Sequence, residues 1–248
     1  MLVSRPPKPP FLTLLRPWLA LLGWGLMGLP VGAQTEVPVA IISHQMRRTS
    51  TGSILVVGEV RNTYPQPLCF VQVDIQYRDA QGRPVGVDRL TAKEAGVMAL
   101  DQVMASRGVI PPGETSPFVR IRDGRKIQGP VQSARLTAKG LRLRGSVNGA
   151  ATITNLQIQR QGNDFRLRGT YNATGRAPNK NPEVIAAGYD AQGQIQVVST
   201  LALTDDGTWR GQPLKQLRPG QRQPFDFTLS NPTGNVTQVK VFPSFACE

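Results

Sequence analysis

Arginine is the residue type with the clearest chemical potential in this 248-residue chain, because arginines recur in pairs separated by one residue. The pairs stand in the segments VRIR, LRLR and FRLR. Alternate side chains of a strand point to one face, so each pair presents two guanidinium groups together. The guanidinium fork suits phosphate and carboxylate groups. If the three strands are neighbours, one sheet face carries six candidate anion-binding residues, namely Arg120, Arg122, Arg142, Arg144, Arg166 and Arg168.

A solvated sheet face is the competing interpretation of these arginines. Exposed strand faces need polar side chains, and arginine near a sheet edge discourages aggregation. The segment from Arg120 to Arg144 holds eight basic residues and one acid, Asp123. Both interpretations stay open: a functional anion-binding face and an ordinary solvated one.

The residue types that enzymes use are sparse. The single histidine, His44, stands in a strand-like segment without neighbouring cysteines or acidic clusters. No Cys/His spacing resembles a zinc site, and neither a Gly-x-Ser-x-Gly motif nor a phosphate-binding P-loop occurs. Asp205 and Asp206 are adjacent, but the following glycine favours a turn, and the further oxygen ligands of a calcium site are not visible nearby. The sequence therefore predicts a non-catalytic protein without metal or cofactor.

Two cysteines, Cys69 and Cys247, are the candidates for a disulfide. Two cysteines allow one intramolecular pairing, and an oxidising compartment favours its formation. The alternative is a buried thiol at Cys69 and an exposed thiol in the C-terminal tail.

The N-terminal residues are typical of a secretory signal. Three basic residues and no acid lie before the apolar run from Trp18 to Leu29, and small residues follow it. Cleavage is expected before Gln34. The run is shorter than the about 20 residues of a membrane-spanning helix. Residues 1–33 are thus predicted to be a signal peptide of an exported protein, periplasmic or extracellular, with an uncleaved N-terminal membrane anchor as the alternative.

The charge balance indicates the class of partner. After the signal the chain carries 26 basic and 16 acidic residues. A basic exported protein is attracted to anionic lipid surfaces, envelope polymers or acidic proteins. Nucleic acid fits less well outside the cytoplasm, and Trp209 is the only tryptophan after the signal, whereas single-strand binders use stacking aromatic residues.

The chain repeats itself. The tetrapeptide DAQG occurs at residues 79–82 and again at 190–193, 111 residues later, and Gly58 and Gly169 have the same separation. A Pro-Gly turn followed by phenylalanine also occurs twice, at 112–118 and 219–225. Landmarks repeated in the same order indicate tandem units of about 100 residues. We expect the units to be residues 34–145 and 146–248.

Each unit shows the pattern of β-strands. Apolar and polar residues alternate in SILVVGEV, FVQVDIQY, FRLRGTY and PFDFTL. Turn residues separate these segments, and residues 91–106 are expected to connect the sheets as a short helix or an irregular loop. The sequence predicts an all-β protein with two tandem Ig-like antiparallel β-sandwich domains after the N-terminal signal segment.

The order of these landmarks resembles the FxLYD domain, a family of small extracytoplasmic β-sandwich modules. The aspartate of the motif matches Asp79 and Asp190, and its tyrosine matches Tyr189, whereas the first unit has Arg78 there. Ile75 and Ala186 replace the phenylalanine of the motif, and Tyr77 and Gly188 replace its leucine. The flanking pattern is matched by Gly58, Asn62, Gly113, Glu114 and Phe118, and by Gly169, Asn172, Gly220 and Phe225. The resemblance implies a fold and a location outside the cytoplasm, and no catalysis.

The leading hypothesis is a non-catalytic exported bacterial envelope protein, a binding or scaffolding module whose basic strand face contacts an anionic polymer, a lipid surface or an acidic protein. The first alternative is a protein–protein assembly factor of a membrane or envelope complex. The second is an enzyme with an unrecognised site. Binding to an anionic partner weakens with salt, whereas apolar protein–protein binding resists it, so salt dependence separates the first two.

Overall fold

The alternating segments fold as antiparallel strands in a computed structural model that describes residues 35–88, 97–143, 147–207 and 210–247. Within these ranges the helical structure is one 3-10 turn, η1 (Gly124–Lys126). The all-β prediction is confirmed. None of the described residues belongs to a helix long and apolar enough to cross a membrane. The predicted signal peptide, residues 1–33, lies outside the described residues.

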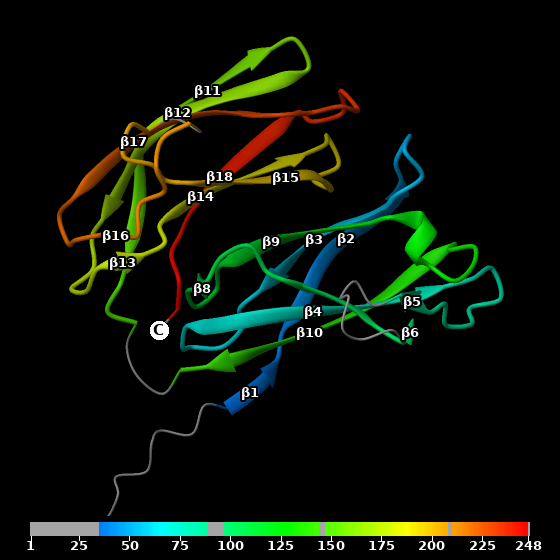
Figure 1. The fold of residues 1–248 in the computed structure, drawn as a ribbon. Coiled ribbons are helices and arrows are strands. Elements are labelled where there is room, and N and C mark those ends of the chain that lie inside the picture. The colour runs from blue at the N-terminus through cyan, green and yellow to red at the C-terminus, as the bar shows by residue number, and fades with distance from the viewer. Residues whose placement is uncertain (1–34, 89–96, 144–146, 208–209, 248) are drawn as a thin grey trace, which may run out of the picture. The chain divides into compact units, whose positions relative to one another are not determined.

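The first half of the chain forms two principal sheets (Figure 1). One has the order β2-β3-β9, from the strands β2 (Ala40–Arg48), β3 (Ile54–Arg61) and β9 (Thr115–Arg122). The other has the order β1-β10-β4-β7, from β1 (Thr35–Pro38), β10 (Ser133–Arg142), β4 (Leu68–Arg78) and β7 (Asp101–Met104), with β8 (Val109–Ile110) also paired to β4. A short pair joins β5 (Val87–Asp88) and β6 (Val97–Met98).

The second half repeats this plan in two three-stranded sheets. One has the order β11-β12-β17, from β11 (Ala151–Gln161), β12 (Asp164–Ala173) and β17 (Arg222–Leu229). The other has the order β15-β14-β18, from β15 (Ile195–Ala202), β14 (Glu183–Tyr189) and β18 (Gln238–Ser244). A short pair joins β13 (Asn179–Lys180) and β16 (Gln216–Leu217).

The repeated residues occupy the same places in both halves. Gly58 faces Phe118 across β3 and β9, and Gly169 faces Phe225 across β12 and β17. A side chain at either glycine would collide with the phenylalanine ring, so glycine is needed for the ring to lie flat on the strand. The two DAQG turns are also alike, because each aspartate accepts hydrogen bonds from the backbone N–H groups two and four residues further on.

The structure describes only the second part of the connection expected at residues 91–106. Residues 91–96 lie outside the described residues, and the remainder contains β6 and β7. Strand β7 pairs with β4, so it occupies the position that β15 holds beside β14 in the second half. The expected boundary after residue 145 also lies outside the described residues, between the end of β10 and the start of β11.

An apolar interface joins the two halves. Strands β3 and β14 are buried along nearly their whole length, because each packs on a sheet on both of its faces. On one side lie the separate cores of the two halves. On the other side Leu55 and Val57 of β3 pack against Ala187, Tyr189 and Ile195. The sheets β2-β3-β9 and β15-β14-β18 are therefore the two inner layers of a four-layer stack (Figure 1).

Polar contacts and a disulfide complete this junction. The Tyr189 hydroxyl donates to a Glu59 carboxylate oxygen at 2.7 Å, and the Arg47 guanidinium donates to the backbone oxygen of Gln196 at 3.0 Å. Cys69 on β4 and Cys247 after β18 form a disulfide, with their Cα atoms 5.9 Å apart. The bridge joins segments 178 residues apart in the sequence and therefore links the first half to the second.

Candidate binding sites

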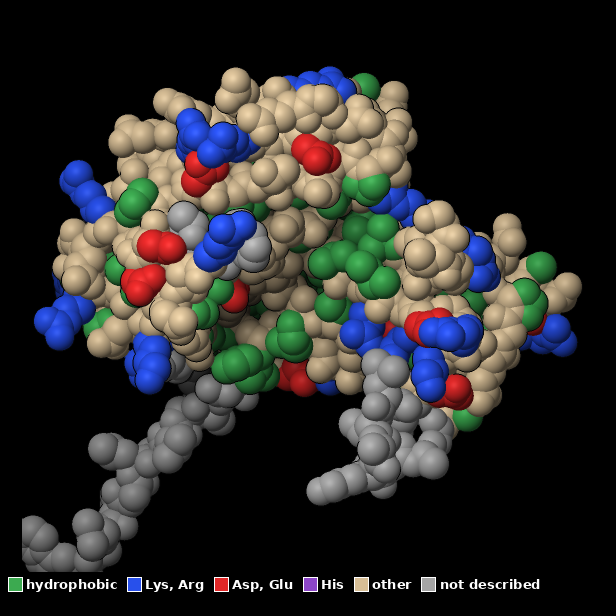
Figure 2. Space-filling view, turned by 45° about the horizontal axis from the view of Figure 1, so that its top comes forward, with side chains coloured by type: hydrophobic (Ala, Val, Ile, Leu, Met, Phe, Trp, Pro, Cys, Tyr) green, Lys and Arg blue, Asp and Glu red, His purple; other side chains and the backbone are tan. Residues whose placement is uncertain are grey.

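The six candidate arginines do not share one sheet face. Strand β9 is paired with β3, β10 with β1 and β4, and β12 with β11 and β17, so the three arginine-bearing strands are not neighbours. Arg144 lies outside the described residues. Figure 2 shows the same dispersion on one side of the molecule, where the basic side chains are scattered and several lie beside acidic ones. The expectation of a single six-arginine surface is wrong because it assumed an adjacency that the topology does not provide.

Arg120 and Arg122 point into the first half, where both bind the same carboxylate. Asp101 on β7 accepts hydrogen bonds from Arg120 Nε at 2.9 Å and Nη2 at 2.7 Å. The Arg122 Nε donates to it at 2.9 Å, and Arg122 Nη2 forms a further ion pair with it. The Arg122 side chain is only 2% exposed. Asp101 therefore occupies both candidate anion-binding residues of this pair, and Arg122 is not accessible to a ligand.

This buried cluster holds the two layers of the first half together. Burial by itself would raise the pKa of Asp101, but the hydrogen bonds from Arg122 and Arg120 outweigh it, so the pKa lies below its ordinary value. The Tyr77 hydroxyl also donates to Asp101, at 3.2 Å. Burial raises the pKa of Tyr77, and the nearby Asp101 charge raises it further. The phenol is thus neutral and the carboxylate ionised at neutral pH, which is the arrangement of a structural ion cluster.

Arg166 and Arg168 lie on the outer face of β12 and retain access to solvent. Both bind Asp226 of β17: Arg166 Nε donates at 2.9 Å and Nη2 at 2.8 Å, and Arg168 Nε donates at 2.9 Å. Hydrogen bonds from Arg166, and then from Arg168, lower the pKa of Asp226. Two guanidinium groups therefore share one carboxylate, which leaves positive charge on this face.

The remaining candidate, Arg142, is half-buried at the end of β10, opposite Thr35 on β1 and Leu68 on β4.

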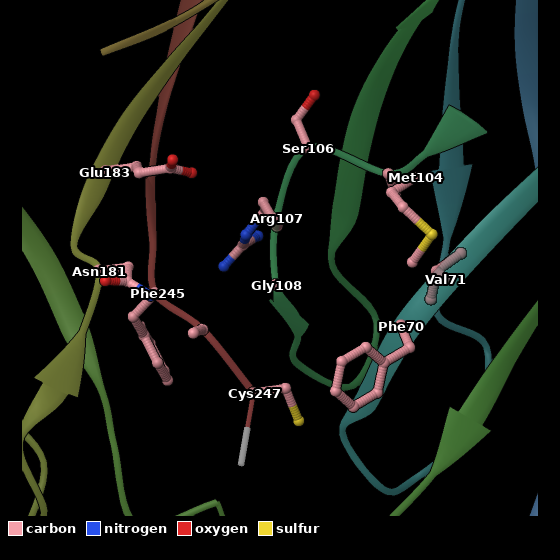
Figure 3. Close-up of a pocket in the computed structure, with 12 residues that line it drawn as sticks. Phe70, Val71, Met104, Ser106, Arg107, Gly108, Asn181, Glu183, Phe245 and Cys247 are labelled. Carbon is pink, nitrogen blue, oxygen red and sulfur yellow. The ribbon is translucent and has the colours of Figure 1, made fainter. Parts of the chain in front are cut away.

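A cleft of about 300 Å³ lies where the two halves meet near the disulfide. Figure 3 shows its walls: Phe70, Val71 and Met104 come from the first half, Asn181, Glu183 and Phe245 come from the second, and the segment Ser106–Gly108 lies between them. Cys247 forms part of the rim. The lining combines apolar side chains with a few polar groups, which is the usual composition of a ligand-binding cleft.

Phe70 is held at this cleft by an unusual backbone. Gly140 of β10 faces both Phe70 and Val71, so β4 contains a bulge with one extra residue. The φ of Phe70 is 49°, in the left-handed region that bulky side chains rarely adopt. The bulge turns the ring outward, and Phe70 is 50% exposed. Asn181, on the opposite wall, also has a positive φ, of 44°.

Two polar side chains of the cleft, Arg107 and Glu183, have hydrogen-bonding groups without a partner among the described residues. Arg107 Nη1 donates to Glu114 at 2.5 Å and to the Thr115 carbonyl at 3.1 Å, but its buried Nε has no hydrogen-bond partner among the described residues. Burial raises the pKa of Glu183, and no ion pair or side-chain hydrogen bond engages its carboxylate within the described ranges. A ligand that donates to Glu183 and accepts from Arg107 would satisfy both.

The residues considered for catalysis are separate from this cleft. His44 is exposed on β2, opposite Gly58. Asp205 accepts from the Gln212 backbone N–H at 3.0 Å, and Asp206 accepts from Thr204 Oγ1 at 3.1 Å, so both carboxylates stabilise a turn. Across the described part of the chain, no group of three His, Cys, Asp or Glu side chains is placed to hold a metal ion.

The sequence itself contains a signal for Phe70. In LCFVQVDIQY the polar phase is Gln72, Asp74 and Gln76, and Phe70 occupies the same phase two residues earlier. An aromatic residue in the polar phase of a strand is a candidate for an exposed anchor. Arg107 carried no comparable signal, because its role depends on a segment from the other half of the chain.

Comparisons with known proteins leave the family of the chain open. No family model matches it, and no curated protein matches it. Among solved structures it is similar to a transglutaminase from red sea bream, with 7% identity and a TM-score of 0.24 over 85% of this chain and 31% of that chain. The chain thus spans under a third of that enzyme. A likeness of this strength carries no argument about function, and the resemblance to FxLYD modules stays a prediction.

Proposed function

We propose that this protein is a non-catalytic binding module of the cell envelope, exported through its N-terminal segment and built from two Ig-like sandwiches of the FxLYD type. It engages a protein partner at the cleft beside Phe70. A protein of this kind would act as an assembly factor, whose binding to its partner rests on apolar contacts.

The observation that carries the proposal is the exposed, left-handed Phe70 at the rim of that cleft. Left-handed backbone costs about 1–2 kcal/mol for a residue with a Cβ. Because half of the Phe70 side chain is exposed, burial of apolar surface offsets little of this cost. Strain of this kind persists at sites where it serves a function. Aromatic side chains are the usual anchors of protein interfaces, and the neighbouring Met104, also exposed, can adapt to the shape of a partner.

An anionic partner on the outer face of β12 is the second candidate. Arg166 and Arg168 present two exposed guanidinium groups against the single carboxylate of Asp226. The surplus positive charge supports attraction to phosphate or carboxylate groups. The smaller number of available arginines makes this candidate the weaker of the two, because Arg120 and Arg122 are occupied by Asp101.

Co-sedimentation of the exported protein with envelope fractions of its host, across a salt series, separates the two candidates. The variants are Phe70→Gly for the cleft and Arg166→Gln/Arg168→Gln for the face of β12. The matched control is Arg61→Gln/Arg135→Gln, which removes two exposed charges elsewhere.

A protein partner at the cleft predicts binding that persists in high salt, is lost in Phe70→Gly, and survives both arginine double variants. An anionic partner predicts binding that falls steeply with salt and is lost in Arg166→Gln/Arg168→Gln but kept in the control. Undiminished binding by all three variants would contradict both candidates.

A further inference from the structure

The free edge of β11 distinguishes this strand from the other sheet edges of the described chain. Strand β11 is paired with β12 on one side only. Its residues from Thr154 to Gln161 are all exposed, including the apolar Leu156 and Ile158. An exposed edge presents unpaired backbone N–H and C=O groups, which can add a strand from another chain.

The other edges carry features that discourage such pairing. Strands β1, β9, β17 and β18 each contain a proline, and β2 ends in two adjacent arginines. Strand β7 has only four residues, and β15 packs beside β2, β3 and β9 of the first half. In contrast, β11 has 11 residues, no proline and one charged residue, Arg160. Its pairing with β12 is irregular between Thr154 and Gln157, where the φ of Asn155 is 52°, and is regular from Gln157 to Gln161.

The charge pattern of β11 is compatible with pairing to itself. In an antiparallel pair centred on Ile158, that residue faces its own copy, Gln157 faces Gln159, and Leu156 faces Arg160. No like charges are then opposed, whereas two facing arginines would be repelled. The pairing would also place the two Ile158 side chains directly opposite each other and Leu156 diagonally across from Ile158 of the second copy, whereas both residues are now exposed to water.

We propose that β11 is a self-association edge, through which a second copy of this chain pairs antiparallel about a two-fold axis. The three-stranded sheet β11-β12-β17 then becomes a six-stranded sheet shared by two protomers. The contact is isologous, so it closes at the dimer and does not propagate into a fibre. A single strand pair is a small interface, and the dimer dissociates on dilution.

Sedimentation velocity of the exported protein over a concentration series tests this proposal. We expect a monomer–dimer equilibrium whose dissociation constant rises at least about tenfold in Ile158→Lys, because two like charges would face each other across the axis. The matched control is Ile121→Lys, which places the same substitution at an isoleucine that is 63% exposed on β9. The control is expected to dimerise like the unaltered protein.

Cysteine cross-linking gives a second readout that does not depend on disruption. Directly opposed residues have Cβ atoms about 4.5–5.5 Å apart. Ile158→Cys, which faces its own copy, and the double variant Gln157→Cys/Gln159→Cys, whose two cysteines face each other, are therefore expected to form covalent dimers under oxidation, unlike Ser133→Cys on β10. A protein that stays monomeric at every concentration overturns the proposal. The proposal is also overturned if Ile158→Lys dimerises as strongly as the unaltered protein and no cross-link forms at these positions. It is likewise overturned if the chain is monomeric and a different protein protects the β11 amides.

Discussion

At the scale of single residues, the protein keeps two arrangements that cost free energy locally. Phe70 exposes an aromatic ring on a left-handed backbone, and Asp101 is a carboxylate buried among two guanidinium groups and a phenol. No contact among the described residues compensates the first, which is why we assign it to binding. The second is compensated by its own hydrogen bonds, which is why we assign it to stability.

Phe70→Gly is expected to raise the free energy of unfolding by about 1 kcal/mol, because glycine adopts a positive φ without strain and little apolar burial is lost. Urea denaturation followed by circular dichroism measures the change. A destabilised variant would show that the ring is packed in solution and would remove the argument from strain.

Asp101→Asn is expected to cost about 3–5 kcal/mol at neutral pH, since it leaves the buried Arg122 without its counter-charge. The pKa of Asp101 lies below its ordinary value of 3.8 in the folded protein. Its stabilising contribution is therefore complete above that value and is lost as the pH falls through the lower folded pKa. Denaturation curves at several pH values should show the gap between the two proteins narrowing below about pH 4. A gap that stays constant in acid would assign the effect to packing.

At the scale of elements, equivalent strands of the two halves differ on the face that decides their neighbours. Leu55 and Val57 of β3 correspond in the repeat to Arg166 and Arg168 of β12. The first pair is buried against the second half, and the second pair faces solvent. The repeat position is thus apolar in β3, where another sheet covers it, and arginine in β12, which lies in an outermost layer that no further sheet covers.

Exchanging these residues tests that interpretation. Val57→Arg is expected to destabilise the protein by about 3–5 kcal/mol, because it buries an unpaired charge in the interface. The reciprocal Arg168→Val, on the solvent face, should change stability by no more than about 0.5 kcal/mol. Thermal or urea unfolding of both variants gives the comparison. Similar effects of the two substitutions would mean that the halves do not pack through β3.

At the scale of the whole molecule, a disulfide and an apolar interface hold the halves together independently. Cys69 and Cys247 close a loop of most of the described chain, and the cluster around Val57 and Tyr189 buries apolar surface between two sheets. The cleft beside Phe70 depends on this joining, since its walls come from both halves.

Cys247→Ser is expected to lower the free energy of unfolding by about 2–5 kcal/mol, as for removal of a cross-link that closes a long loop. The far-ultraviolet circular dichroism spectrum should stay unchanged, because the apolar interface persists. Melting curves with and without a reducing agent measure the effect. A reducing agent should lower the melting temperature of the unaltered protein and leave that of the variant unchanged. A drop in the melting temperature of the variant would show that the reducing agent acts on something other than this disulfide.

The sequence by itself determined the strands, the turns and their repetition. Alternation along SILVVGEV or FVQVDIQY and the Asp and Gly of DAQG act over a few residues, so they can be recognised without knowing what lies elsewhere. One further local signal was available: β3 and β14 are apolar in both phases, which is typical of strands covered on both faces.

Only the tertiary structure decided what the chemically active side chains meet. Arg120 and Arg122 looked like a ligand-binding pair in VRIR, but Asp101 reaches them from a strand some 20 residues away in the sequence. The cleft joins residues from β4 with residues that follow β18. Ion pairing and cleft formation depend on contacts between distant segments, and a local pattern of residue types carries no information about which segments those are.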